Sequence, residues 1–81
     1  MSTSDEVAAE VLRELASAML SNPPQHSLHE GYAVILEEMD ELWEEVKTNP
    51  RKNPVRLANA RKEAIQIAAM AIRLVVDVCD K

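Results

Sequence analysis

Several residue types are scarce in this sequence, and each scarcity excludes a class of structure. The 81 residues include one Gly, one Trp, one Tyr and no Phe. A β-sandwich needs glycine-rich turns and strands rich in aromatic or β-branched residues, so the composition argues against that class. The four prolines cluster at 23–24 and 50–54, which suits long helices separated by two breaks. The single cysteine, Cys79, excludes an internal disulfide and a cysteine-based zinc site.

Basic residues and long apolar runs are also scarce. Nine Lys and Arg stand against fourteen Asp and Glu, which gives a net charge of −5. An acidic chain binds the nucleic-acid backbone poorly, so we expect no DNA or RNA partner. The N-terminal stretch lacks the basic region of a signal peptide. No apolar run reaches the roughly 18 residues of a membrane span. We therefore expect a cytoplasmic protein that does not associate with membranes.

What remains is the composition of one small folded domain over residues 1–81. Hydrophobic residues make up 47% of the chain and charged residues 28%. Helical periodicity predicts three helices, over residues 5–20, 28–47 and 54–79. The connection between the second and third is short, so these two are expected to form an antiparallel hairpin. The predicted fold class is all-α.

Capping residues support these helix limits. Ser4 is the expected N-cap of the first helix, because its hydroxyl can accept from an unpaired backbone N–H. Ser27 and Glu30 have the spacing of a capping box before the second helix. Asn53 is the expected cap of the third helix, with Pro54 at its first position.

The third predicted helix has more apolar surface than one chain can cover. Apolar residues occupy over half of its circumference, whereas a surface helix needs only one apolar stripe. We therefore expect homo-oligomerisation into a shared helical bundle, as a homodimer or a tetramer. On the apolar side of the second helix, Tyr32 and Trp43 are expected to pack in the core rather than to stack on a base.

Carboxylates gather on one side of the second predicted helix. Five of them fall within an arc of about 120° at 3.6 residues per turn: Glu37, Glu38, Glu41, Glu44 and Glu45. In an antiparallel hairpin, Glu63 and Gln66 of the third helix are level with Glu38 and Glu41. Oxygen ligands from two helices suit Mg²⁺ or Mn²⁺ better than zinc. The alternative is a solvated acidic face, with Glu63 paired to Arg61 or Lys62.

The pattern Glu37-Glu38-x-x-Glu41, followed by Glu63-x-x-Gln66, resembles the EExxE…ExxD signature of the MazG-like all-α nucleoside triphosphate pyrophosphohydrolases. The stretches at 29–38 and 63–71 are also similar to small members of that family. The resemblance covers about residues 28–78, which is most of the chain.

The resemblance implies a helical dimer or tetramer that uses Mg²⁺ to hydrolyse nucleoside triphosphates to monophosphate and pyrophosphate. It also implies that Glu38, Glu41 and Glu63 are metal ligands. Glu37 would be a further ligand or the base that activates water. Gln66 stands where the family has an aspartate, and its carbonyl can bind Mg²⁺ without supplying charge. A second interpretation follows from Gln66: a helical oligomer without catalytic activity that binds a nucleotide or a protein.

Three further side chains are candidates for substrate binding. Arg73 could hold a phosphate, or it could pair with Asp77 one helical turn later. Lys62 lies next to Glu63 in the sequence and is a weaker phosphate candidate. His29 could contact a nucleotide at the rim of the site, or it could be a solvated residue in the first turn of its helix.

Overall fold

The computed structural model describes residues 2–81, which fold into three α-helices and contain no strand. Helix α1 spans Ser4–Ser21, α2 spans Leu28–Val46 and α3 spans Arg56–Leu74. A π-helical turn, η1, follows α3 over Val75–Cys79, where the sequence predicted a continuing α-helix. The prediction of an all-α fold is confirmed. Within the described part of the chain, no helix combines the length and the apolar character needed to cross a membrane.

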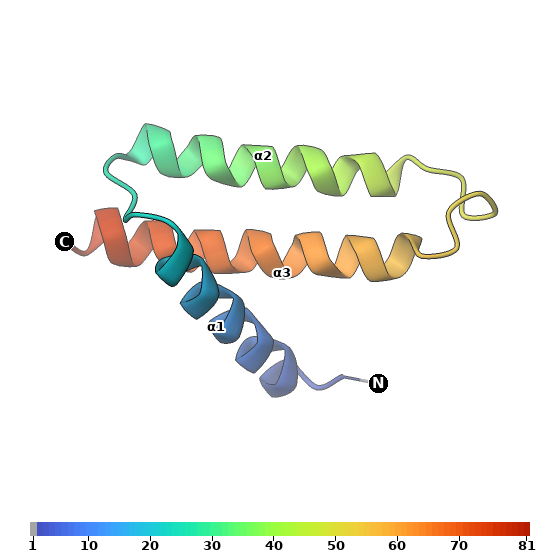
Figure 1. The fold of residues 1–81 in the computed structure, drawn as a ribbon, viewed down its shortest axis with the longest axis horizontal. Helices are drawn as coiled ribbons and strands as arrows, with labels where there is room; N and C mark the ends of the chain where they lie inside the picture. The colour runs from blue at the N-terminus through green and yellow to red at the C-terminus, as the bar shows by residue number, and fades with distance from the viewer. Residues whose placement is uncertain (1) are drawn as a thin grey trace.

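Helix α3 is the central element of the fold. Figure 1 shows α2 and α3 lying side by side and running in opposite directions, while α1 crosses α3 obliquely. Both α1 and α2 pack against α3. The buried core lies between α1 and α3, where Val11 and Leu15 meet Ala69. This core is small, and the molecule measures 45 by 27 by 19 Å, so much apolar surface stays outside it.

The first two helices begin at side-chain caps. The N-cap of α1 is Thr3, one residue earlier than the predicted Ser4. The Thr3 hydroxyl accepts from the backbone N–H of Glu6 at 3.1 Å and donates to the Glu6 carboxylate at 3.0 Å. Ser27 caps α2 as predicted, accepting from the backbone N–H of Glu30 at 3.0 Å. The first turns are thus fixed by short-range contacts that the sequence makes visible.

The third helix begins differently from the prediction. It starts at Arg56, and no side chain caps it. The Asn53 amide donates instead to the carboxylate of Glu45 and the hydroxyl of Thr48, each at 3.2 Å. Arg56 donates to the backbone carbonyls of Glu45 at 2.9 Å and Val46 at 2.7 Å. Both side chains therefore donate hydrogen bonds at the C-terminal end of α2, and neither caps the start of α3.

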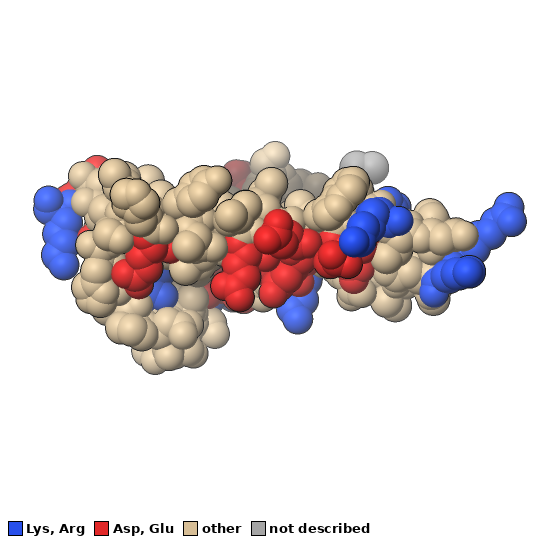
Figure 2. Space-filling model, turned by 90° about the horizontal axis from the view of Figure 1, so that it is seen from above, with Lys and Arg blue, Asp and Glu red and all other residues tan. Residues whose placement is uncertain are grey.

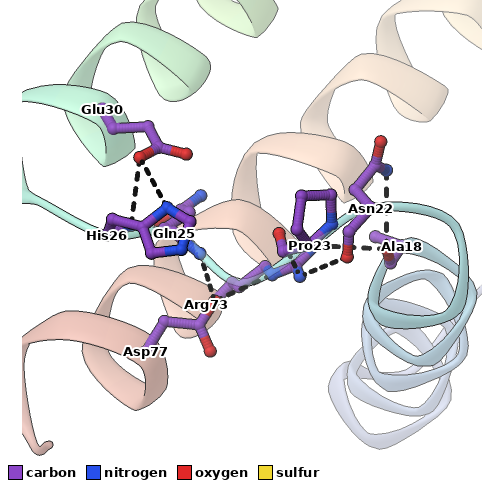
Figure 3. Close-up of polar contacts among 8 residues, drawn as sticks. All are labelled: Ala18, Asn22, Pro23, Gln25, His26, Glu30, Arg73 and Asp77. Carbon is purple, nitrogen blue, oxygen red and sulfur yellow. Dashed lines mark hydrogen bonds and ion pairs between the residues drawn. The ribbon is translucent and has the colours of Figure 1, made fainter.

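Arg73 of α3 likewise donates to backbone carbonyls at the C-terminal end of α1 (Figure 3). Its guanidinium donates to the backbone carbonyls of Ala18 at 3.1 Å and of Asn22 and Pro23 at 2.8 Å. It also donates to the Asp77 carboxylate at 3.0 Å, so the predicted ion pair is present. Arg73 is only 3% exposed. Neither α1 nor α2 has a basic residue in its own last turn. Helix α3 supplies one to each helix end, Arg73 to α1 and Arg56 to α2.

Helix α2 carries six of the thirteen large apolar side chains that are exposed in the described part of the chain. Five of its large side chains alternate at intervals of four and three residues and are each between 43% and 65% exposed: Tyr32, Leu36, Met39, Trp43 and Val46. We call this set the α2 stripe. The prediction that Tyr32 and Trp43 pack in the core of the chain is wrong, because α2 turns a different side towards α3.

That other side of α2 is set by Gly31, which is buried against α3. A Cβ atom at this position would overlap the side chain of Leu74. A larger residue here would therefore force the side chains of Leu74 and Gln25 to move. Because Gly31 faces α3, Glu38 faces it as well, two helical turns further along the same side.

Candidate metal centre

Three carboxylates from two helices converge near the middle of the α2–α3 pair. One ligand oxygen from each of Glu38, Glu41 and Glu63 lies within 4.8 Å of the others. Glu38 and Glu41 are three residues apart and so share one side of α2, while Glu63 approaches from α3. Glu38 and Glu63 are half-buried, and Glu41 is exposed. Figure 2 shows carboxylates gathered at the centre of the face seen from above, over α2.

The Gln66 side chain closes this group from α3. One end of its amide lies 2.8 Å from Glu38 Oε2 and 3.1 Å from Glu63 Oε2. With its nitrogen at that end, the amide donates to both carboxylates. A half-turn about the terminal torsion exchanges nitrogen and oxygen, and the oxygen can then join the carboxylates around a cation. The four residues that the sequence placed level with one another thus lie together.

The negative charge of this group and its burial change the pKa of Glu38. Burial raises the pKa of Glu38 to about 7, with further contributions from its hydrogen bond to Glu63 and from the negative charge of Glu41. The proton that Glu38 keeps near neutral pH reduces repulsion among the three carboxylates. A divalent cation would have the same effect and would compete with that proton.

Glu37 lies outside the convergent group. It is exposed, because it is one helical position, or about 100°, away from Glu38 around α2. The structure therefore does not place it among the residues whose ligand atoms meet.

The alternative expected for Glu63, an ion pair with Arg61 or Lys62, is not formed among residues 2–81. Arg61 pairs instead with Glu10 of α1, at 2.7 Å. The Arg61 guanidinium holds the pKa of Glu10 below its ordinary value through this hydrogen-bonded contact. Glu63 therefore faces the other carboxylates without a basic partner among residues 2–81. This favours a metal site over a surface where Glu63 is neutralised by an ion pair.

The three candidates for substrate binding have different surroundings. Arg73 is buried, and its guanidinium makes four hydrogen bonds to carbonyls and to Asp77, which favours the ion-pair alternative over a phosphate site. Lys62 is exposed and lines a cavity that also borders Gln66. His29 is exposed in the first turn of α2. It lies nine residues before Glu38, or about 13 Å from it along the helix axis, which is too far for direct contact with the metal centre.

The cavity beside Lys62 brings in a residue that the sequence did not single out. It has a volume of about 460 Å³ and lies between α1 and α3. Three basic side chains line it together with two carboxylates and an amide: Arg13, Arg61, Lys62, Glu10, Glu14 and Gln66. Arg13 was missed because the first helix could not be placed relative to the other two from spacing alone. We call this space the basic cavity.

The arrangement offers three carboxylates and an amide oxygen to a hard cation, next to a cavity with cationic side chains. Such a combination suits a phosphorylated ligand that arrives together with a divalent cation. Comparisons of the chain with protein-family models, with curated proteins and with solved structures found no match.

Proposed function

We propose that the protein is a Mg²⁺-dependent nucleoside triphosphate pyrophosphohydrolase that releases a monophosphate and pyrophosphate. The observation that carries the proposal is the convergence of Glu38, Glu41 and Glu63 to within 4.8 Å, with the Gln66 amide in contact with two of them. The family resemblance of the same residues supports the choice of reaction. Mn²⁺ is the expected substitute for Mg²⁺, because it takes the same oxygen ligands.

Each residue of the site has a defined part in this proposal. Glu38, Glu41 and Glu63 hold the cation, and Gln66 turns its oxygen towards it. The cation, when bound, acidifies water and offsets negative charge on the phosphate oxygens. Glu37, the expected base, lies outside the group of converging carboxylates, so it would accept the proton of the attacking water once its exposed side chain turns towards the cation. Water adds to phosphorus, and the bond between the α- and β-phosphates breaks.

The basic cavity is the proposed site of the departing phosphates. Arg13 and Lys62 reach it from α1 and α3, and it borders Gln66. Cationic side chains at this place would stabilise the charge of leaving pyrophosphate. Arg61, although it lines the same cavity, is already paired with Glu10, so we assign phosphate binding to Arg13 and Lys62.

We further propose that the protein is a homodimer, or a tetramer built from such dimers. The α2 stripe alternates at four and three residues, which is the spacing of a coiled-coil seam. A second copy would cover this stripe with its own. The sequence pointed to the third helix as the interface, but α1 and α2 already pack on α3. The interface is therefore proposed on α2.

The test is a panel of nucleoside triphosphates with Mg²⁺, with Mn²⁺ and with a chelator, assayed for monophosphate and pyrophosphate. We expect turnover with either cation and none with the chelator. Glu38→Gln, Glu41→Gln and Glu63→Gln should each reduce turnover at least tenfold, because each removes a charged ligand. Glu44→Gln is the matched control, since Glu44 is exposed and pairs with Lys47. Orthophosphate as the product, or equal loss in the control, would contradict the proposal.

The second candidate function is a helical oligomer that binds nucleotide without hydrolysing it. Gln66 favours it, because an amide in place of a carboxylate gives the cation one negative charge fewer. Nucleotide binding that requires Mg²⁺ but yields no pyrophosphate over many hours would establish this function instead.

A further inference from the structure

A second cavity also borders Gln66. Its volume is about 360 Å³, and side chains from all three helices and from the α1–α2 connection line it. Its apolar walls include Pro23, Val34 and Met70, and it borders the metal centre through Glu38 and Gln66. A concave, largely apolar space with a few polar groups is the usual form of a small-molecule pocket.

One polar side chain of this cavity has no partner in the fold. Gln25 is 5% exposed and lies beside Arg73 and Asp77 (Figure 3). Its backbone N–H donates to Asp77 at 2.9 Å, which fixes the chain there. Its side-chain oxygen Oε1 is buried and finds no hydrogen-bond partner among residues 2–81. A buried amide without a partner destabilises the fold, and an apolar residue would avoid this.

The cavity connects this amide with the metal centre, because Gln25 and Glu38 both line it. Oε1 lies against Gly31, because a Cβ atom there would be only 2.8 Å from it. Gly31 is seven residues before Glu38 on the same side of α2, or about 10 Å along the axis. A nucleotide with its phosphates at the carboxylates would place its base at about this distance.

We propose that this cavity binds the nucleobase of the substrate and that Gln25 is a specificity-determining residue that reads the base edge. The inference rests on the proposed function. Bases with an exocyclic amino group are favoured, because the unpaired Gln25 Oε1 accepts a hydrogen bond. The Glu30 carboxylate of the same cavity already accepts from the backbone N–H of His26. The amide can turn about its terminal torsion to bring Oε1 to the ligand.

The test uses two pairs of substrates in which an amino group on the base is replaced by an oxo group and the neighbouring ring nitrogen gains a hydrogen: CTP with UTP, and ATP with ITP. In the wild type we expect kcat/KM to favour the amino member of each pair at least about tenfold, the effect of one hydrogen bond. Gln25→Leu should bring both ratios close to one. It should also leave the melting temperature equal or higher, because it removes the unpaired amide. Ser21→Ala, an exposed change in the same region, should leave the ratios as they are.

A binding measurement separates this inference from the proposed function. Calorimetry with CMP and UMP needs no hydrolysis, and we expect the wild type to bind CMP more tightly and Gln25→Leu to bind both alike. If no triphosphate is hydrolysed but this selectivity is seen, the proposed function fails and the cavity assignment stands. If hydrolysis occurs with equal ratios, or with a preference that survives Gln25→Leu, the inference is overturned and the proposed function remains.

Discussion

Replacing Glu38 by Gln should make the metal-free protein more stable at alkaline pH while weakening its binding of Mg²⁺. The neutral amide keeps the size and hydrogen-bonding capacity of protonated Glu38. It removes one of three negative charges from a group spanning 4.8 Å. The same charge that repels its neighbours in the metal-free site attracts the cation, so the two effects have opposite signs.

The direction of the pH dependence follows from the raised pKa. Folding favours protonated Glu38, so its contribution to stability is fully present below the unfolded pKa and is lost as the pH rises through about 7. The step from the ordinary value of 4.5 to about 7 corresponds to about 3 kcal/mol at 1.36 kcal/mol per pH unit. Water reaches this half-exposed group and screens its charge, so we expect about 1–2 kcal/mol to be observed.

The assay is urea unfolding followed by far-UV circular dichroism, at one protein concentration, between pH 5 and pH 8. The difference in unfolding free energy between Glu38→Gln and the wild type should be near zero at pH 5. It should reach about 1–2 kcal/mol in favour of the variant at pH 8. Added Mg²⁺ should stabilise the wild type more at pH 8 than at pH 6, and the variant less at both. A variant that is less stable than the wild type at pH 8 without metal would refute the reasoning.

The remaining predictions concern the fold, the assembly and the fourth ligand. Arg73→Met should lower the melting temperature markedly, because it leaves Asp77 and three backbone carbonyls without their donor; thermal unfolding compared with the exposed control Arg51→Met measures this. Trp43→Glu should leave a helical protein whose mass in light scattering is near 9.0 kDa, because a charge in the α2 stripe opposes pairing; an unchanged larger mass would place the interface elsewhere. Gln66→Asp should raise Mg²⁺ affinity in calorimetry and turnover with it, because it adds an anionic ligand, and a fall in both would show that the amide has another role.

Much of the site was predictable because its residues belong to one helical pair. Once two helices run in opposite directions from a short connection, the rise per residue fixes which positions are level. Glu38, Glu41, Glu63 and Gln66 could therefore be placed together from the sequence. The role of Glu37 stayed open, because its side chain points about 100° away from that of its neighbour Glu38.

The contacts that the sequence did not reveal link residues about fifty positions apart. Arg73 meets the carbonyls at the end of α1, and nothing in local spacing distinguishes such a contact from a phosphate site. Gln25 was overlooked for a related reason. It stands in a connection rich in proline and polar residues, where burial is not expected. Only the packing of the connection against η1 shows that its amide is enclosed.

The same long-range contacts determine when the early helices can be completed. Arg56 supplies the end of α2, and Arg73 the end of α1. Most of the stability of a helix in a protein comes from tertiary packing, and both helices pack on α3. We therefore expect α1 to fluctuate during synthesis, with its last carbonyls bonded to water, until residue 73 has left the ribosome. Helix α1 is synthesised before α2, but the residue that bonds its last carbonyls is synthesised after the one that bonds those of α2. We therefore expect the nascent chain to gain its structure late and as a single unit.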